Sequence, residues 1–517
     1  MDRIRREFVH QIGEMRLEPP LLTRREMLKV SGLALGGAVL GATLSSATAV
    51  AKSLQSSPTP RIGIIGAGIA GIVAALTLHD AGVPSTVFEA SDRIGGRMHS
   101  DNTFWSDGQT SEWCGEFIDS DHYVVRHLAE RFGLTLLNVN AAEPPGSVDT
   151  NYFLHGYYTD AELRRDMKPI VPILVAQNQA IGPVATYKRY TPAGYYFDHL
   201  SSYDWIETYV PGGHASRLGQ YMDVATVDEN GLDSREQSSL NLIFPLDSNE
   251  RFHIRKGNEQ LPAAIAASLP QGTIRLGCRM IQISAEDGDE VTVTFATASG
   301  QQTSSFDYVI LALPFSVLRG LDYSQAGFDS LKQTAITELG YGTNSKLILQ
   351  FDDRYWNGRG AWPGISDGFI ETDLPFQSTW DSSRAEPGPD GLLTCYTGGS
   401  EGASYRPPGP YTTSQDSPVT ALYARQFLRQ LEVVWPGVSD HYTGRAELSY
   451  PTGDPNLLGS YSTYKVGQYT LFADYEKVPQ GRIYFAGEHT SYNFQGFMEG
   501  GAESGRRAAL EVLDAMA

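Results

Sequence analysis

The chain has 517 residues, which is too long for one simple core and predicts at least two domains. Hydrophobic residues make up 41% and charged residues 19%, as is typical of a folded protein. The formal net charge of −20 argues against a nucleic-acid partner and favours a cationic small substrate. Cys114, Cys278 and Cys395 are too few and too widely spaced for a disulfide framework or a metal cluster, so we expect structural thiols or at most one bridge, and no metal site.

The N-terminus has the pattern of an export signal. Arg24 and Arg25 precede a stretch, residues 30–51, that carries no charge and is dominated by small residues. This layout is typical of a bacterial twin-arginine signal, and Ala49 and Ala51 suit a small-residue cleavage site. We therefore predict a signal peptide over 1–51, recognition by the twin-arginine export machinery, and a periplasmic or secreted location. An uncleaved membrane anchor is the alternative, because the uncharged stretch is long enough to cross a bilayer.

A dinucleotide-binding motif follows the Pro- and Ser-rich linker, residues 52–60. Residues 61–65 (RIGII) predict a short buried strand, and GAGIAG at 66–71 has the spacing G-x-G-x-x-G. Gly66 permits the tight turn, Gly68 allows a pyrophosphate to approach the backbone, and Gly71 lets the next helix pack closely on the strand. The helix is predicted to end near residue 82, and its N-terminus would face the phosphates.

An acidic residue completes the motif. Residues 85–88 predict a second strand, and Glu89 follows it directly. A carboxylate at this place can accept both ribose hydroxyls of an adenosine, and it disfavours the 2′-phosphate of NADP. The motif therefore predicts Gly66, Gly68, Ala70, Gly71, Glu89 and Ala90 as cofactor contacts.

Two further segments extend the cofactor motif. Residues 90–97 (ASDRIGGR) supply a second glycine pair with an arginine. Near the C-terminus, GRIYFAGEHTS at 481–491 predicts a strand that breaks into a turn, and FMEGGAESGRRAA at 497–509 predicts a helix that starts near Met498. With these segments the chain resembles the flavin amine oxidase family, which includes monoamine, polyamine and L-amino-acid oxidases.

The resemblance implies that FAD is the cofactor and adds contacts to it. In the family the Gly-Gly-Arg run wraps the FAD, which points to Gly95, Gly96 and Arg97. Glu488, after Gly487, would contact the ribityl or phosphate region, and the backbone at Met498 would reach the flavin pyrimidine. The positive end of the helix that starts there would stabilise negative charge on the reduced flavin.

The order of the motifs predicts a discontinuous cofactor domain. Residues 255–262 resemble the family's strand that returns to this domain, and residues 306–314 resemble its later core strand. The predicted fold is α/β, with a Rossmann-like FAD-binding domain that carries an inserted α+β substrate domain. The FAD-binding domain is assigned to 61–120, 250–346 and 446–517, and the substrate-binding domain to 121–249 and 347–445.

Three residues match the family's catalytic positions. In related amine oxidases two aromatic rings flank the substrate nitrogen in front of the flavin, and the matching residues here are Tyr461 and Phe497. Aromatic faces can hold a cation and guide an amine. Lys346 matches the family lysine that holds a water against flavin N5. The alternatives are ordinary core packing for the two rings and a solvated strand lysine.

The substrate class is less well defined by the sequence. Some L-amino-acid oxidases carry an arginine near 113–122 that binds the substrate carboxylate, and this chain has none there. Glu116 and Asp119 offer negative charge instead, as in polyamine oxidases, although either could pair within the protein. Basic amino acids remain candidates if Arg189, Arg217 or Arg251 reaches the pocket from the substrate domain.

The resemblance implies the oxidation of an amine or L-amino acid by hydride transfer to flavin N5. The imine would hydrolyse to a carbonyl compound and ammonia or an amine, and molecular oxygen would be reduced to hydrogen peroxide. The alternatives are an exported FAD amine dehydrogenase with a cytochrome-like acceptor and a non-catalytic flavoprotein scaffold. The oligomeric state is open, with a homodimer among the options.

Overall fold

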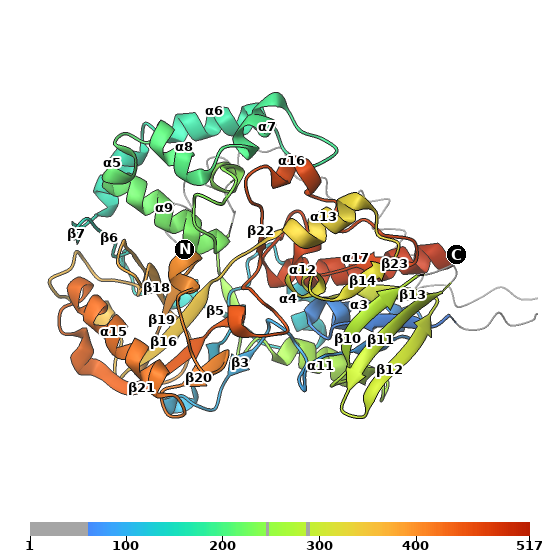
Figure 1. The fold of residues 1–517 in the computed structure, drawn as a ribbon. Helices are drawn as coiled ribbons and strands as arrows, with labels where there is room; N and C mark the ends of the chain where they lie inside the picture. Colours follow the sequence, from blue (N-terminus) through green and yellow to red (C-terminus); the bar gives the residue numbers. More distant parts are fainter. Residues whose placement is uncertain (1–59, 245–247, 286–289) are drawn as a thin grey trace, which may run out of the picture.

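The computed structural model describes residues 60–244, 248–285 and 290–517. The predicted signal peptide, and the predicted linker apart from residue 60, lie outside these ranges and stay predictions. Figure 1 shows two lobes, and in one of them the first described segments (blue) lie beside the last helix of the chain (red). The two ends of the sequence therefore build one part of the molecule, as the cofactor motifs predicted.

A five-stranded parallel sheet forms the centre of the cofactor lobe, in the order β23-β13-β1-β2-β9. Its strands β1, β2 and β13 are short, apolar and almost wholly buried, as parallel strands covered on both faces must be. The register places Ile64 of β1 opposite Ile310 of β13, which lies opposite Tyr484 of β23. The strands are β1 (Ile62–Ile65), β2 (Thr86–Phe88), β9 (Ile274–Arg275), β13 (Tyr308–Leu311) and β23 (Ile483–Phe485).

Different layers cover the two faces of this sheet. On one face α3 (Ile69–Asp80) and α17 (Met498–Met516) pack together with α4 (Tyr123–Arg131) and α11 (Gln260–Ser268) around one apolar core. On the other face lies a four-stranded sheet in the order β12-β11-β10-β14, and the Phe88 and Phe295 rings stack across the interface. The strands of this second sheet are β10 (Arg279–Ser284), β11 (Val291–Thr297), β12 (Gly300–Phe306) and β14 (Asp322–Gln325).

An antiparallel six-stranded sheet forms the base of the other lobe, in the order β17-β18-β19-β16-β21-β20. Helix α15 (Pro418–Val434) packs against it through Phe427 and Leu431, which share a core with Trp356 and Trp435. The strands are β16 (Ser345–Phe351), β17 (Ile370–Glu371), β18 (Ser378–Asp381), β19 (Gly391–Thr397), β20 (Tyr411–Thr413) and β21 (Tyr442–Ser449).

A group of helices completes this lobe above the sheet (Figure 1). They surround a core of their own that contains Trp205 and Phe153, both fully buried. The helices are α5 (Asp160–Met167), α6 (Val171–Ile181), α7 (Pro192–Asp198), α8 (Ser202–Tyr209), α9 (Arg217–Asn230) and α10 (Leu240–Ile243).

Short elements connect the layers. In the described part of the chain the remaining α-helices are α12 (Phe315–Leu318), α13 (Ser330–Glu338), α14 (Gly399–Gly402) and α16 (Gln468–Phe472). The two-stranded pairs are β3 (Ser100–Asp101) with β4 (Ser111–Glu112), β5 (Leu136–Asn138) with β8 (Phe252–Ile254), β6 (Tyr152–Phe153) with β7 (Gly156–Tyr157), and β15 (Gly340–Tyr341) with β22 (Ser462–Thr463).

The structure corrects three of the predicted domain boundaries. The boundary after residue 346 falls inside β16, and the one after 445 falls inside β21, although each strand is a single element of the six-stranded sheet. The boundary after residue 120 is also wrong, because Val125 and Leu128 of α4 belong to the core of the cofactor lobe. The predicted boundaries follow the ends of the sequence motifs. They differ from the structure because contacts between distant segments, which no motif marks, decide where each element packs.

One predicted strand is not extended. Residues 255–262 form a turn that leads into α11, and the strand is β8, immediately before them. Lys256 and Gly257 have positive φ angles of 67° and 106°, which lie outside the extended region of the backbone. The other predicted elements of the cofactor motifs agree with β1, α3, β2, β13, β23 and α17.

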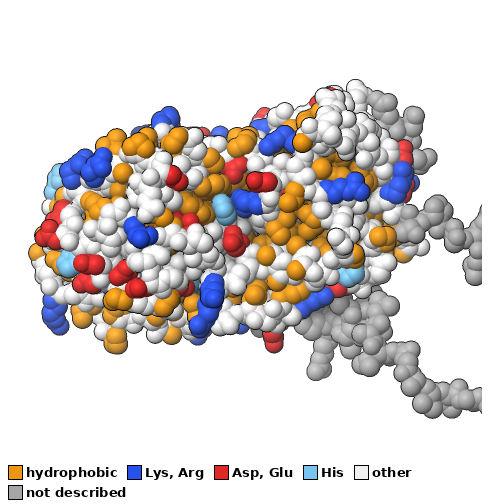
Figure 2. Space-filling model, turned by 90° about the horizontal axis from the view of Figure 1, so that it is seen from below, with side chains coloured by type: hydrophobic (Ala, Val, Ile, Leu, Met, Phe, Trp, Pro, Cys, Tyr) orange, Lys and Arg blue, Asp and Glu red, His pale blue; other side chains and the backbone are white. Residues whose placement is uncertain are grey.

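On the face shown in Figure 2, basic and acidic side chains are interspersed among apolar ones, so the acidic excess does not form one continuous patch there. Within the described ranges, none of the helices is both long enough and apolar enough to cross a membrane.

The contact between α3 and α17 depends on glycine. A Cβ atom on Gly505 would lie 2.0 Å from the Ala70 carbonyl oxygen, and one on Gly501 would lie 2.7 Å from Ile69 Cγ2. We expect Gly505→Ala to force the helices apart and to lower the free energy of unfolding by about 1–3 kcal/mol. Thermal unfolding of the purified protein measures this loss.

Leu510→Ala is the matched control, because it shortens a side chain that is 42% exposed on the same helix. The thermal unfolding midpoint of the Leu510→Ala variant should stay close to that of the parent protein. Equal midpoints for the Gly505 and Leu510 variants would show that the close helix contact is not required.

Candidate active site

A cavity of about 1340 Å³ lies between the cofactor lobe and the substrate lobe. Its lining includes the turn before α3, the Gly95–Gly96 turn and the start of α17 on one side. On the other side it includes side chains from β16, β18 and β19 and from the helical group. A ligand bound at the cofactor motifs would therefore share one continuous space with a ligand bound against the substrate lobe.

Close backbone packing restricts two positions of the first motif to glycine. Gly66 has a φ of 104°, and a Cβ there would lie 2.6 Å from the Ala312 carbonyl oxygen. A Cβ on Gly71 would lie 1.9 Å from the Gly66 carbonyl oxygen. Gly68 forms a backbone bridge to Gly95, so the two predicted glycine turns lie side by side. The N-terminus of α3, which has no side-chain cap, is free to bind an anion through its N–H groups.

Glu89 lies at the end of β2 and orients the same turn. Its Oε2 accepts the Ala67 N–H at 2.7 Å, and its Oε1 accepts the Ser91 N–H and hydroxyl at 2.9 and 2.8 Å. Each oxygen of an ionised carboxylate can accept more than one hydrogen bond. Three donors already use three of the about four acceptor positions of this carboxylate, so the half-buried side chain keeps capacity for about one hydroxyl group in the cavity. Its contact with both ribose hydroxyls stays a prediction.

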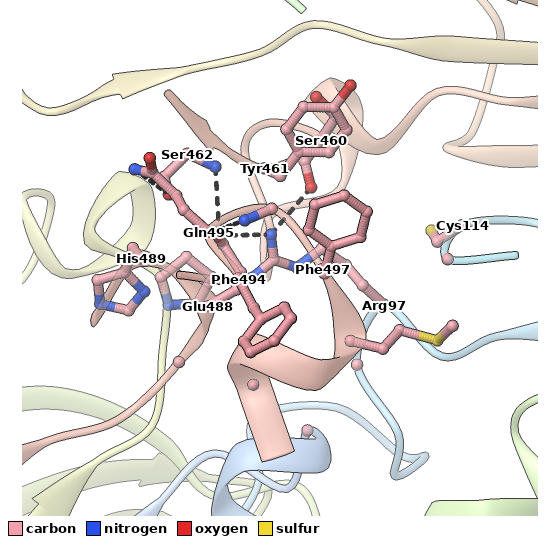
Figure 3. Close-up of a pocket in the computed structure, with 18 of the residues that line it drawn as sticks. Arg97, Cys114, Ser460, Tyr461, Ser462, Glu488, His489, Phe494, Gln495 and Phe497 are labelled. Atoms are coloured by element: carbon pink, nitrogen blue, oxygen red, sulfur yellow. Dashed lines mark hydrogen bonds and ion pairs between the residues drawn. The ribbon is translucent and has the colours of Figure 1, made fainter. Parts of the chain in front are cut away.

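An ion pair between half-buried Arg97 and buried Glu488 joins the second glycine turn to the C-terminal motif. One guanidinium nitrogen of Arg97 donates to Glu488 Oε1 at 2.8 Å and to the Ser460 carbonyl at 2.9 Å. Glu488 also accepts from the Ser462 hydroxyl at 2.7 Å and from the Gly496 N–H at 2.8 Å. Burial raises the pKa of Glu488, but the Arg97 charge and these donors outweigh it and hold the pKa below its usual value. Figure 3 shows this network beside Tyr461 and Phe497.

The start of α17 provides a second anion-favouring end in the cavity. Its N-cap, Phe497, makes no side-chain hydrogen bond to the helix, and Met498 and Gly501 line the cavity. Glu499 faces away and accepts the N–H groups of Val124 and Val125, which ties α17 to α4. The positive end of the helix dipole therefore points into the space where the sequence predicted the flavin.

His489, on the cofactor side of the cavity, is buried without hydrogen bonds from its ring. Its side chain is 1% exposed, and neither ring nitrogen has a hydrogen-bond partner. Burial lowers the pKa of His489 to about 3, so the ring is neutral. Uncapped amides, glycine turns, the Glu89 carboxylate and a buried unpaired imidazole together fit a large dinucleotide such as FAD.

The predicted aromatic pair lies in the same cavity. Tyr461 and Phe497 both line it, and their rings lie near each other in Figure 3. The Tyr461 hydroxyl donates to the Asp228 carbonyl at 3.1 Å and lies 3.2 Å from the Tyr396 hydroxyl. Burial raises the pKa of both tyrosines, so both remain neutral phenols. The structure brings these residues together, while their catalytic role stays a prediction.

Lys346 and Glu116 differ from their predicted roles. The Lys346 ammonium is 2.8 Å from Glu116 Oε2, and it also donates to the carbonyls of Glu112 and Cys114 at 3.1 and 2.7 Å. An ammonium has three N–H groups, so none is left to hold a water. The other oxygen of Glu116 accepts the Trp380 Nε1–H at 2.9 Å. Glu116 therefore pairs within the protein rather than waiting for a cationic substrate.

Asp119 is also held by the protein. Its Oδ1 accepts the Asn249 N–H at 3.0 Å, the Ser248 hydroxyl at 3.2 Å and the Glu250 N–H. Burial, followed by the nearby Glu250 charge, raises the pKa of Asp119 to about 7. The residue lines the cavity, but its hydrogen bonds are made within the protein. This is the alternative to substrate binding that the sequence left open.

Among the described residues that line the cavity, none is an arginine of the substrate lobe. Arg93, Arg97 and Arg279 line it, and all three come from segments assigned to the cofactor domain. Arg189, Arg217 and Arg251, which the sequence left open, are not among the lining residues. Arg217 lies 3.7 Å from Glu162, and Arg251 packs over Phe252. Within the described residues, no arginine is placed to bind a substrate carboxylate in the predicted manner.

Sequence reasoning missed several residues of the site. Ser460 and Ser462 flank Tyr461; the Ser460 carbonyl accepts from Arg97, and the Ser462 hydroxyl donates to Glu488. Their position next to a predicted site residue is a signal in the sequence that could have identified them. Trp380 and Tyr396 come from β18 and β19, in a stretch rich in aromatic residues. Nothing local distinguishes these two rings from the aromatic side chains that fill the core of the same lobe.

The bonds of Glu89 generate a prediction about cofactor affinity. Glu89→Ala removes a charged acceptor from the Ala67 turn and from the predicted ribose site, and hydrogen bonds to charged groups contribute roughly 1.5–3 kcal/mol. We expect the dissociation constant for FAD to rise roughly tenfold or more. Titration of the apoprotein with FAD, followed by flavin fluorescence, measures it. Glu130→Ala, at an exposed position on α4, should leave the constant unchanged, and the same result for Glu89→Ala would contradict the assignment.

Comparison with known proteins agrees with this geometry. The family model for flavin containing amine oxidoreductases matches residues 69–513. YobN of Bacillus subtilis (strain 168), provisionally named an L-amino-acid oxidase, is 27% identical over 90% of this chain and 97% of its own length. L-amino acid oxidase Bs29 of Bothriechis schlegelii is 24% identical over 89% of this chain and 92% of its own length.

Among solved structures, cyclohexylamine oxidase from Brevibacterium oxydans IH-35A superimposes with a TM-score of 0.74. The identity is 20%, and the match covers 89% of this chain and 100% of the other, so it shows a shared fold. The match of one family model to most of the chain, together with the cofactor cradle, establishes that the protein belongs to the flavin containing amine oxidoreductase family and is an FAD-dependent enzyme.

Proposed function

We propose that the enzyme oxidises the carbon–nitrogen bond of an amine and releases the product as an imine that water hydrolyses to a carbonyl compound and ammonia or an amine. The observation that carries the proposal is one cavity that joins the predicted FAD contacts to an aromatic wall, the rings of Tyr461, Phe497, Tyr396 and Trp380. FAD, when bound, accepts a hydride at N5 and passes two electrons to oxygen, which leaves as hydrogen peroxide.

The protein's own residues would bind and orient the amine. Tyr461 and Phe497 present aromatic faces to the cavity, and such faces attract a cation and pack against an apolar carbon chain. Tyr396 and Trp380 extend this wall, and their rings lie 5.1 Å apart. A wall of rings excludes water, which protects the imine until it leaves the site.

The lining favours amines that lack a carboxylate. Within the described chain, no arginine from the substrate lobe lines the cavity, and Lys346 is already paired with Glu116. Asp228 and Glu229 also line it on that side, and their charge would favour a cationic substrate. L-amino acids are the second candidate, supported by the names of the two relatives in sequence.

Anaerobic reduction of the bound flavin tests the activity and the substrate class together. We expect a monoamine or a diamine to bleach the flavin absorbance faster than any L-amino acid, because a carboxylate would be desolvated without a partner. Stopped-flow absorbance at a series of substrate concentrations measures the rate and the apparent affinity.

Readmitting oxygen completes this experiment. Fast return of the oxidised spectrum with hydrogen peroxide supports an oxidase, and slow return supports a dehydrogenase with another acceptor. Faster bleaching by an L-amino acid would overturn the amine preference. A flavin that no amine or amino acid reduces would refute the catalytic proposal.

The aromatic wall gives a second prediction. Tyr461→Leu removes the ring, and interactions of a cation with an aromatic face contribute about 0.5–2 kcal/mol. We therefore expect kcat/KM for the best amine to fall roughly 2- to 30-fold. Tyr461→Phe keeps the ring and loses only the hydroxyl bonds, so its loss should be smaller. Equal losses in the two variants would assign the effect to the hydroxyl and contradict the proposed role of the ring.

A further inference from the structure

Lys346 is the centre of a closed array of buried polar contacts. Its side chain and that of Glu116 are 7% and 8% exposed, and the two form a salt bridge of 2.8 Å. The remaining two N–H groups bind carbonyls of residues 112 and 114. All three contacts therefore lie on one segment, residues 112–116, which forms a wall of the cavity.

The sheet of the substrate lobe supplies the opposite partners. Lys346 on β16 lies directly across from Tyr396 on β19, so both side chains project from the same face. Trp380 lies on the next strand, β18, two residues along from Ser378, which pairs with Tyr396. The Trp380 ring packs 5.1 Å from that of Tyr396, and Lys346 Nζ lies 5.5 Å from the Trp380 ring centroid.

Glu116 connects the lysine to this aromatic wall. One carboxylate oxygen binds Lys346, and the other accepts the indole N–H of Trp380 at 2.9 Å. Trp380 packs on Tyr396, whose hydroxyl lies 3.2 Å from that of Tyr461. The chain of contacts thus runs from Lys346 through Glu116, Trp380 and Tyr396 to the predicted substrate ring.

We propose that Glu116 is a positioning residue, which neutralises Lys346 and holds Trp380 so that the aromatic wall has one fixed shape. This proposal deepens the proposed function, since the wall is where the amine would lie. It replaces the role that the sequence suggested for Glu116, a direct contact to a cationic substrate. Removing the Glu116 charge would leave the buried Lys346 ammonium without a counter-charge. We therefore expect the contacts of Lys346, Glu116 and Trp380 to be lost together.

A double-mutant cycle on the FAD-bound protein tests this coupling without any substrate. Glu116→Gln and Lys346→Met each leave one buried charge alone, whereas the double variant removes both charges. We expect each single variant to lower the unfolding midpoint by several degrees, and the double variant to lose less than the sum. Asp80→Asn with Arg131→Met is the control cycle, because that salt bridge is 44% and 47% exposed and should show little coupling.

Kinetics separate positioning from substrate binding. A positioning role predicts that Glu116→Gln lowers kcat/KM roughly tenfold for monoamines and diamines alike. Trp380→Phe keeps the ring but loses the N–H donor, so it should lower kcat/KM in the same direction. Trp362→Phe is its control, because the indole nitrogen of buried Trp362 has no hydrogen-bond partner and the ring lies outside the cavity lining.

Two results would overturn the proposal. One is additive loss of stability in the Glu116 and Lys346 cycle. The other is a Glu116→Gln variant that raises KM for diamines only, which would make the carboxylate a substrate contact. If no amine reduces the flavin at all, the proposed function fails, and the unfolding cycle still decides the role of Glu116.

Discussion

The ion pair between Arg97 and Glu488 joins two residues that are 391 positions apart, and the cofactor site depends on it. Arg97 follows the second glycine turn, Glu488 follows β23, and the Ser460 carbonyl comes from the segment that carries Tyr461. Because Glu488 is 4% exposed, its charge is tolerable only with a partner and with the donors of Ser462 and Gly496. The same contact therefore holds the predicted cofactor-binding turns together and positions Tyr461, one ring of the aromatic wall.

Elsewhere in the cavity, charge is also neutralised within the protein. Lys346 pairs with Glu116, Asp119 accepts backbone and hydroxyl donors, and burial keeps His122 and His489 neutral by lowering the pKa of each. The aromatic wall adds faces and phenol groups with raised pKa values rather than further charges. Such a lining suits a reaction that needs a dry site and a substrate nitrogen that carries its lone pair.

The parts of the site that follow a local rule were predictable. Gly66, Gly68, Gly71 and Glu89 occupy positions where backbone geometry or phosphate approach restricts the residue type, and the strand-turn-helix spacing makes them visible. The start of α17 at Met498 agrees with its glycine-rich sequence. Lys346 and Glu116 were singled out, but only the fold brings them into contact, because they lie 230 residues apart.

By itself, the sequence determined the cofactor chemistry, the discontinuous α/β plan and the short list of rings and charges that could face the flavin. Those features depend on residues close together in the chain, where spacing and residue type carry the information. The tertiary structure decided which charges cancel, which aromatic residues of β18 and β19 form the wall, and that α4 belongs to the cofactor lobe. These outcomes depend on burial and on contacts between distant segments. The role of a buried charge or ring depends on the partner that the fold places beside it, because a buried charge is stable only when it is paired or hydrogen-bonded.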